Sequence, residues 1–398
     1  MARLIDITGK ALSGEWGTDD DTGNGIPVLR TTNFTNEGIV NYDSVVTRKI
    51  TKKNIDEKYL RPGDIILEKS GGSDKQPVGR VIYFEGPENT YLFNNFTGLL
   101  RVKETDRWWP RYVFYSLYAN YRRGGTREYE NKTTGLHNLK TDTYVSRYEV
   151  SEAPYEQQRQ ICERLDMISS IIRLRQQELQ KLDDIIKARF VEMFGDPVRN
   201  QKGWDIHLLD ECLERIDNGK SFVCSDKPRQ GNYPAVLKLS AATYGDYRPN
   251  ENKALLVESQ FVEGAEVHSG DLLFTRKNTP ELVGMAAYVQ ETPEKLMMPD
   301  LIFRLVTNEK MNPVFLWQLI NCKEFRPVIQ GIAGGSAKSM SNISKERLGK
   351  VRVICPPRKL QDELIPFIVQ VDKSKVVVQK ARDESQLLFD SLMQLFFG

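Results

Sequence analysis

The stretch QQRQICERLDMISSIIRLRQQELQKLDDIIKARFVEMFGDP, which runs from Gln157 to Pro197, decides the fold of this chain of 398 residues. Apolar residues recur along it at alternating steps of four and three, the spacing of a coiled-coil seam. Pro154 precedes the pattern and Gly195 follows it, as at the two ends of a helix. The stretch therefore predicts one charged helix of about ten turns. Eight of its ten seam positions are apolar: Ile161, Leu165, Ile168, Ile172, Arg175, Leu179, Leu182, Ile186, Arg189 and Met193.

A second seam closes the chain. Pro366 lies in its first turns, so we expect a kink or a late helix start there. Nine of its eleven positions are apolar: Leu360, Leu364, Phe367, Val371, Ser374, Val378, Ala381, Ser385, Leu388, Leu392 and Leu395.

Each seam needs a partner, and the other seam is the obvious one. A helix of this length spans roughly 57 Å, and the linker Gly195–Trp204 that follows it is short. An antiparallel pair places both attachment points of the intervening segment at one end. We therefore predict an antiparallel coiled coil that holds two globular halves apart. The alternative is that each helix packs only on its own half.

The two halves repeat one another. Six short segments recur in the same order, displaced by 203 to 208 residues; one pair is PGDIIL (Pro62–Leu67) with SGDLLF (Ser269–Phe274). A single match would be chance, but six in order predict an internal duplication. Each copy is a globular part followed by a long helix.

Each globular half mixes short β-rich runs with a helical segment, which predicts an α+β fold. We predict two pseudo-symmetric globular domains, 1–153 and 198–355, each followed by a spacer helix, 154–197 and 356–398. After Pro110 the helical segment carries aromatic residues that we expect in the core rather than as a stacking platform: Tyr112, Phe114, Tyr115, Tyr118 and Tyr121.

The composition limits the class of protein. The formal net charge of +2 is too small for a protein that holds nucleic acid by charge alone. No signal-peptide pattern and no long apolar run is present, so we expect a cytoplasmic protein. An odd number of cysteines without a C-x-x-C pair argues against a disulfide framework or a cysteine zinc site. They are Cys162, Cys212, Cys224, Cys322 and Cys355.

No catalytic motif emerges, so we predict no catalytic residues and no metal site. Asn218–Ser221 (NGKS) resembles the tail of a phosphate loop, but the required upstream glycine falls on Glu214. The histidines His137, His207 and His268 stand far apart, and we expect each to be a surface or loop residue rather than a ligand. A protein that binds and positions is the simpler reading, and two copies suit a bipartite target.

Several motifs together resemble the specificity (S) subunit of type I restriction–modification enzymes, along essentially the whole chain. The carriers are GIPVLRTTNF (Gly25–Phe34), PGDIILEKSGG (Pro62–Gly72), HSGDLLFTRKN (His268–Asn278), APYEQQRQICERLD (Ala153–Asp166), CPPRKLQDELI (Cys355–Ile365) and FVEMFGDP (Phe190–Pro197). A Pro followed by a Gln at each helix start, together with the MFGDP ending, is the most specific combination.

The resemblance implies a function for each part. Each globular half would be a target recognition domain, and the chain would read an asymmetric bipartite DNA target with an unread spacer. It would be inactive alone and bind no cofactor itself. It would assemble with two methyltransferase subunits that bind S-adenosylmethionine, and with restriction and translocase subunits that use ATP and Mg. The alternative is a non-catalytic coiled-coil adaptor that docks two proteins without reading DNA.

Two loops per half are candidates for DNA contact. The first lies between two predicted strands and carries the side-chain types that read base edges or phosphates; a solvated hairpin is the alternative. Its candidates are Lys69, Ser70, Ser73, Lys75, Gln76 and Arg80, with Arg276, Lys277, Asn278 and Thr279 in the second copy. The second loop combines basic with small residues, which suits close approach to phosphates. Its candidates are Arg122, Arg123, Arg127 and Lys132, with Ser336, Lys338 and Ser339 in the second copy.

Large apolar residues also lie off the seam of the first helix. They exceed what one helix pairing needs, so we predict that they bind partner subunits. They are Ile171, Ile185, Phe190 and Val191.

Overall fold

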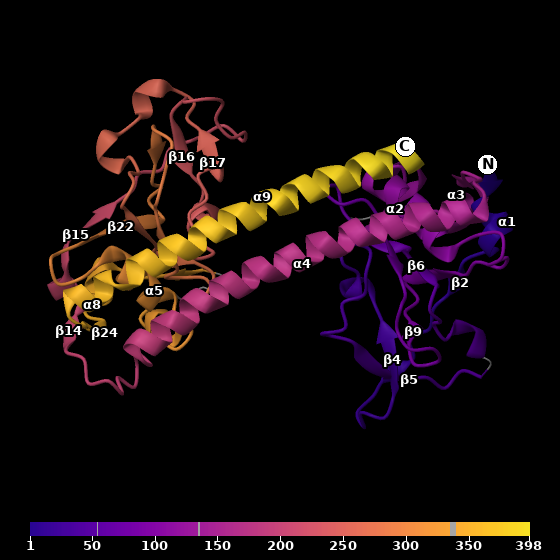
Figure 1. Ribbon diagram of the computed structural model, residues 1–398, viewed down its shortest axis with the longest axis horizontal. Coiled ribbons are helices and arrows are strands. Elements are labelled where there is room, and N and C mark those ends of the chain that lie inside the picture. The colour runs from indigo at the N-terminus through magenta and orange to yellow at the C-terminus, as the bar shows by residue number, and fades with distance from the viewer. Residues whose placement is uncertain (54, 134–135, 335–339) are drawn as a thin grey trace. The chain divides into compact units, whose positions relative to one another are not determined.

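A computed structural model describes residues 1–53, 55–133, 136–334 and 340–398 (Figure 1). The chain divides into two compact units. The first comprises Met1–Gln176 with Lys380–Gly398, and the second comprises Gln177–Gln379. This division cuts both long helices near their middles, so the domain limits predicted at residues 153, 197 and 355 stay predictions.

The first unit is built on a four-stranded antiparallel sheet whose two central strands are fully buried, with Leu99 opposite Ile66. Its order is β2 (Leu12–Ser13), β10 (Thr97–Leu100), β6 (Ile65–Glu68) and β8 (Val81–Tyr83). A second sheet has the order β3 (Thr18–Asp19), β5 (Val46–Lys49), β4 (Ile26–Leu29) and β9 (Leu92–Phe93). Two small sheets pair β1 (Ala2–Arg3) with β13 (Glu149–Val150), and β11 (Glu130–Thr133) with β12 (Leu136–Leu139) and β7 (Ser70–Gly72).

The second unit repeats the order of the main sheet and has smaller versions of two of the other sheets. Its main sheet has the order β15 (Leu213–Asn218), β22 (Ile302–Thr307), β18 (Leu272–Thr275) and β20 (Ala286–Tyr288). Its other sheets are β17 (Asn252–Ala254) with β16 (Ala235–Leu237) and β21 (Leu296–Met297), β14 (Ile206–Leu208) with β24 (Arg352–Ile354), and β19 (Lys277–Asn278) with β23 (Ser341–Asn342). The parallel pair β4–β9 returns as β16–β21. The predicted duplication is thus a repeat of strand order, and the pseudo-symmetry of the two units stays a prediction.

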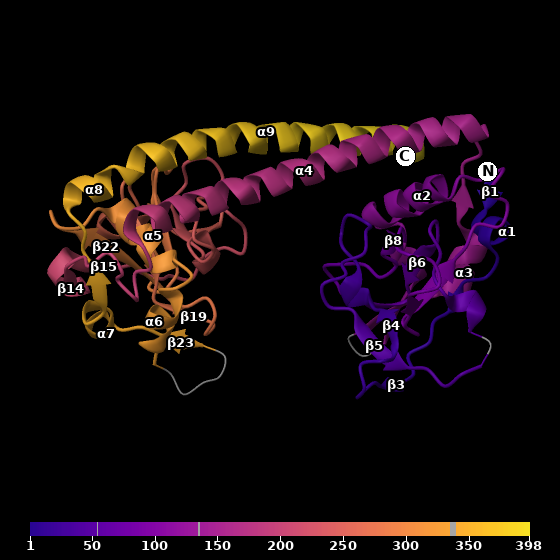
Figure 2. The ribbon, with the colours of Figure 1, turned by 60° about the horizontal axis from the view of Figure 1, so that its bottom comes forward.

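A helix covers the main sheet of each unit. In the first unit it is α2 (Pro110–Arg122), which lies along β8, and in the second it is α5 (Pro313–Asn321), which lies along β20 (Figure 2). Both begin with Pro at the first helical position, where the missing N–H has no helical partner. The five aromatic side chains of α2 are buried, which confirms their predicted place in the core. Short helices complete the units: α1 (Leu4–Thr8), α3 (Thr141–Arg147), α6 (Arg326–Gly331) and α7 (Lys345–Gly349).

The predicted long helix is α4 (Tyr155–Phe194), and all ten seam positions are buried or half-buried. The C-terminal helix is α9 (Leu364–Phe397), preceded by the short α8 (Arg358–Asp362). The late start predicted from Pro366 is confirmed, because the helix breaks at Glu363 and Pro366 becomes the third residue of α9. At that position a proline leaves no intrahelical hydrogen bond unmade.

Both units pack α4 against α9. In the first unit Leu165, near the start of α4, shares a core with Met393 near the end of α9. In the second unit Ile186, near the end of α4, shares a core with Ile368 near the start of α9. The helices therefore run antiparallel within each unit, as predicted.

The predicted seam of α9 is wrong near its C-terminal end. Leu388 is 51% exposed and Leu395 is 72% exposed, whereas Phe389, Met393 and Phe397 are buried. An α-helix has 3.6 residues per turn, so a strict seven-residue pattern drifts by about 20° per heptad in a straight helix. After several heptads the contact line has moved by one residue. Within the described residues, no helix is both long and apolar enough to cross a membrane.

Candidate nucleic-acid interface

In the first unit the two candidate loops meet in one small sheet. Strand β7, from the first loop, pairs with β12, from the second, so that Ser70 lies opposite Asn138 and Gly72 opposite His137. The backbone N–H of Leu139 also donates to the Lys69 carbonyl over 2.8 Å. Segments that lie far apart in sequence thus form one surface.

The second unit makes the equivalent contact. Strand β19, which occupies the place of β7 in the repeat, pairs Lys277 with Asn342 and Asn278 with Ser341 of β23. Gly334 and Asn342 exchange two backbone hydrogen bonds of 2.8 Å. The same two loops therefore come together in both units.

A tight turn presents the exposed candidates of the first unit. The Ser73 N–H donates to the Gln76 carbonyl over 2.6 Å, and the Gln76 N–H donates to Ser73 Oγ over 3.2 Å. Ser73, Lys75 and Gln76 are exposed at its tip. The guanidinium of Arg127, also exposed, donates to the Asp74 carbonyl over 3.4 Å. This turn is well placed to meet a groove or a phosphate.

Lys69 and the candidates of the second unit differ in how exposed their side chains are. Lys69 Nζ donates to Ser13 Oγ over 3.0 Å, and burial lowers the pKa of Lys69. Thr279 is exposed, and Lys277 is half-buried. Thr279 and Lys277 stay candidates for DNA contact in this unit.

Arg80 does not face outward. Its Nη1 donates to the Phe34 carbonyl over 3.0 Å, and its Nη2 donates to the Thr31 carbonyl over 2.9 Å. Its Nη2 also pairs with the buried Glu68 carboxylate at 3.3 Å. Arg80 therefore holds the Thr31–Phe34 segment against β6, and its predicted DNA contact stays a prediction.

Asn278 and Arg276 also hold the fold together. Asn278 is buried; its Nδ2 donates to Thr243 Oγ1 over 3.1 Å, and its Oδ1 accepts from the Thr279 N–H over 2.8 Å. Arg276 lies over the Phe303 ring and donates to Asn342 Oδ1 from Nε and Nη2 over 3.3 and 3.2 Å. Both polar ends of Asn278 have partners within the fold, and its predicted DNA contact stays a prediction.

Arg122 and Arg123 turn toward α9 of the same unit. Arg122 Nη1 lies 2.7 Å from Asp390 Oδ1, and Arg123 Nη1 donates to the Phe397 carbonyl. The local excess of basic residues thus partly serves helix packing. The side chain of Lys132, and all of Ser336, Lys338 and Ser339, lie outside the described residues.

His137 was expected at the surface or in a loop, and that expectation is wrong because it lies in β12. It is buried, with Nδ1 3.0 Å from Glu130 Oε2 and Nε2 3.6 Å from Asp74 Oδ1. Glu130 Oε1 accepts the Val78 N–H over 2.9 Å. His137 therefore joins the β11–β12 hairpin to the exposed turn. Nothing in the sequence singled it out, because the contact depends on the register of the hairpin. His268 is exposed, as expected.

Three of the four predicted partner-binding residues are exposed: Ile171, Ile185 and Val191. Phe190 is 2% exposed and packs against Phe194 and Phe315 in the core, so little of its side chain is open to a partner, and its predicted partner contact stays a prediction. In the second unit a pocket of about 610 Å³ lies between the end of α4 and the end of α5. Its lining includes Ala188, Val191, Gln318 and Cys322.

The chain thus comprises two α+β units, each with two loops that pair and two long helices that pack together. Known proteins are similar to it. Residues 4–184 match the family described as the type I restriction modification DNA specificity domain. The specificity subunit of the type I restriction enzyme EcoEI of Escherichia coli is 30% identical over 196 residues, which are 48% of this chain and 33% of that relative. This alignment thus spans about a third of the relative's length. The EcoKI specificity subunit of E. coli strain K12 is 22% identical over 396 residues, 93% of this chain and 80% of that relative.

Solved structures agree on the fold. The S subunit of a type I restriction–modification system from M. genitalium has a TM-score of 0.56 at 11% identity, covering 100% of this chain and 95% of that one. A chain from a study of complex assembly and conformational transition of the type I system has a TM-score of 0.51 at 15% identity, covering 100% and 96%. These matches agree with the resemblance drawn from the sequence: residues 4–184 match the DNA specificity domain family, and 93% of the chain aligns with a type I specificity subunit.

Proposed function

We propose that this chain is the sequence-specific DNA-recognition subunit of a type I restriction–modification complex. It reads an asymmetric bipartite target, one half-site with each unit, and leaves the spacer between them unread. The observation that carries this proposal is the pairing of the same two loops in both units, on β7 and on β19. A protein that docked partners without reading DNA would have no need of this repeated arrangement.

The chemistry of the loops supports different half-sites. The first unit presents Lys75 and Gln76 at the turn after β7. The second presents Lys277 on β19 and Thr279 directly after it. Lys contacts guanine edges or phosphates, Gln pairs with adenine, and Thr accepts or donates to several bases. Different side chains in the corresponding loops of the two units suit a target whose two halves differ.

The chain itself performs no catalysis in this proposal. Two methyltransferase subunits supply S-adenosylmethionine and transfer the methyl group, and restriction and translocase subunits supply ATP-driven steps with Mg. The exposed Ile185 and Val191 and the adjoining pocket favour docking of an apolar partner surface. Val191→Asp should therefore weaken assembly, while Val223→Asp, at an exposed position of the second unit outside the pocket lining, should not. Size measurement of the co-expressed complex tests this, and a stable one-to-one assembly would contradict two docking sites.

Sequence-selective binding tests the main proposal. The chain, assembled with its methyltransferase partners, is titrated with a library of random duplexes, and bound DNA is sequenced at two salt concentrations. We expect one bipartite motif, with affinity that falls as salt rises. Binding without any enriched motif would favour the adaptor alternative.

A further inference from the structure

A buried glutamine joins the start of α4 to the first unit. Gln158 is 1% exposed; its Oε1 accepts the Trp109 N–H over 2.9 Å. Its Nε2 donates to the Arg107 carbonyl over 3.0 Å and to the Ala153 carbonyl over 2.8 Å. Trp109 is the residue that precedes α2. One side chain thus links the entry of α4 to the entry of α2 through three hydrogen bonds to the backbone.

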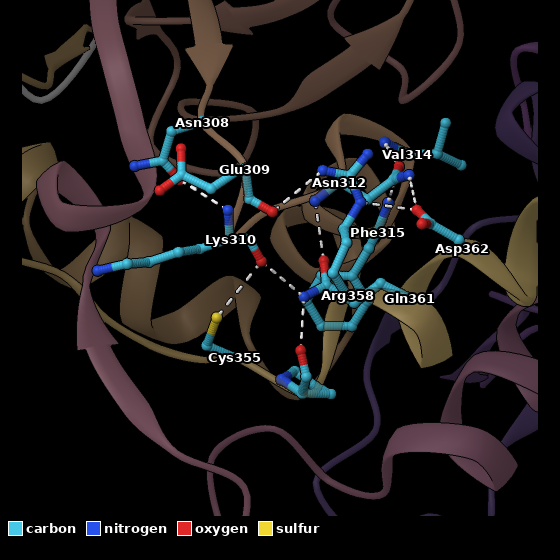
Figure 3. Close-up of polar contacts among 11 residues, drawn as sticks. Asn308, Glu309, Lys310, Asn312, Val314, Phe315, Cys355, Arg358, Gln361 and Asp362 are labelled. Atoms are coloured by element: carbon cyan, nitrogen blue, oxygen red, sulfur yellow. Dashed lines mark hydrogen bonds and ion pairs between the residues drawn. The ribbon is translucent and has the colours of Figure 1, made fainter.

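The second unit carries the same link. Gln361 of α8 is 0% exposed; its Oε1 accepts the Asn312 N–H over 2.8 Å. Its Nε2 donates to the Lys310 carbonyl over 2.9 Å and to the Pro356 carbonyl over 2.7 Å (Figure 3). Asn312 is the residue that precedes α5. Each member lies 203 residues after its counterpart, as in 361 − 158 = 203.

The surroundings of the two glutamines differ, although the link is the same. Beside Gln361 the neighbours are polar: Asp362 Oδ1 accepts from Asn312 Nδ2 and from Arg358 Nε, both over 2.7 Å (Figure 3). Beside Gln158 they are aromatic and cationic. There the Trp109 ring centroid lies 6.1 Å from that of Tyr155, and the Arg159 guanidinium lies 5.7 Å from the Trp109 centroid.

We propose that Gln158 and Gln361 are positioning residues that fix how each recognition domain is joined to its long helix, and so restrict the gap accepted between the two half-sites. The proposal rests on the proposed function. A role in stability alone does not require Gln158 and Gln361 to keep the same three backbone partners where their neighbouring residues differ. Backbone partners fix direction more firmly than side chains, because they do not change rotamer. A looser joint would let a domain rotate to follow a displaced half-site.

The test uses the chain assembled with its methyltransferase partners and duplexes whose gap between half-sites changes one base pair at a time. Gln158→Leu keeps volume and removes all three hydrogen bonds. Gln158→Glu keeps the acceptor for Trp109 and is the second variant if the first does not fold. Gln157→Leu, at the exposed neighbouring position, is the matched control, and Gln361→Leu repeats the test in the other unit.

One added base pair turns the second half-site by about 34–36°. The parent protein should therefore discriminate strongly between neighbouring gaps. In Gln158→Leu and Gln361→Leu, the ratio of the affinity at the preferred gap to the affinity at the next gap should fall at least about threefold. The half-site sequences should not change, and Gln157→Leu should behave as the parent does.

Two outcomes separate failure of this proposal from failure of the proposed function. Equal weakening at every gap, with the ratio unchanged, would show that the glutamines only stabilise the fold. If the parent protein binds no half-site at any gap, the proposed function itself is wrong. Variants that fold and keep the sharp gap preference also overturn the positioning role.

Discussion

Arg122 on α2 and Asp390 on α9 form an ion pair, with Nη1 2.7 Å from Oδ1. The Arg122 guanidinium also lies over the Tyr118 and Phe389 rings. These contacts attach the end of α9 to α2 within the first unit. A basic residue beside a candidate DNA loop thus has a structural partner, and the two roles make different predictions.

Arg122→Ala and Arg127→Ala should differ in what they change. The Arg122 side chain is 36% exposed, so loss of its ion pair should cost about 0.2–1 kcal/mol of unfolding free energy. Base preference should stay unchanged. Arg127→Ala should lower the unfolding free energy little, because its exposed guanidinium lies 3.4 Å from the Asp74 carbonyl. It should weaken binding to all sequences alike and reduce the slope of log affinity against log salt by about 1.

Denaturant titration and salt-dependent gel shifts of both variants check these outcomes. A lower salt slope in Arg122→Ala, with unchanged stability, would return Arg122 to the DNA-contacting set.

The exposed turn should read only one half of the target. Gln76→Ala or Lys75→Ala should relax selection at positions in one half-site, because loss of one base contact costs about 1–3 kcal/mol. Thr279→Ala should act on the other half-site. Lys53→Ala is a control, since Lys53 is exposed and lies outside both candidate loops in the sequence.

Sequencing of DNA selected by each variant gives the result. Equal loss of selection in both half-sites after Gln76→Ala would contradict the assignment of one unit to one half.

The pair of Arg80 with Glu68 predicts a pH-dependent loss of stability. Burial raises the pKa of the Glu68 carboxyl, and the charge of Arg80 opposes that rise. In Arg80→Met the pKa of Glu68 should rise further. A carboxyl with a raised folded-state pKa keeps its contribution below the unfolded pKa and loses it as pH rises through the folded pKa. At neutral pH the Arg80→Met variant should therefore lose about 1–3 kcal/mol of unfolding free energy. Near pH 5 it should lose less.

Chemical unfolding of the variant at both pH values measures this difference. The double variant Arg80→Met with Glu68→Gln removes the titrating group, so its stability loss should be the same at both. An equal loss in the single variant would mean that Glu68 gains no further proton.

The spacing of apolar residues along the chain predicted local structure, such as the long helices. The course of α4 followed from its seam, because burial on one helix face leaves a regular mark in the sequence. The seam failed at Leu388 and Leu395, because drift accumulates with helix length. The pairing of Ser70 with Asn138 was beyond sequence reasoning, since backbone hydrogen bonds between distant strands carry no side-chain signature.

Charge alone also could not separate the roles of arginines. Arg122, Arg127 and Arg80 look alike in a sequence, and only their partners distinguish them. A carboxylate such as Asp390 lies far along the chain from the arginine it pairs with. The candidate loops were therefore predictable as regions, and the individual contact residues were not.

The length of the helix pair should set the unread spacer. Ser169–Arg175 is one heptad of α4, and the contact of Arg382 with Gln176 indicates that Asp383–Phe389 is its counterpart in α9. Duplicating both segments keeps the seam in phase and adds about 10 Å of helix at 1.5 Å per residue. At 3.4 Å per base pair this corresponds to about three base pairs.

The lengthened protein should select a gap that is about three base pairs longer, because helix rise and DNA rise then match. Each added base pair also turns the second half-site by about 34–36°, so affinity should fall unless the DNA or the complex twists. Duplicating the heptad in α4 alone puts the seam out of register and should destabilise the fold without defining a new gap. Methylation mapping in a strain with each version gives the outcome. An unchanged gap with full activity would exclude the helix pair as the ruler, and a changed half-site sequence would mean that the helices themselves contact bases.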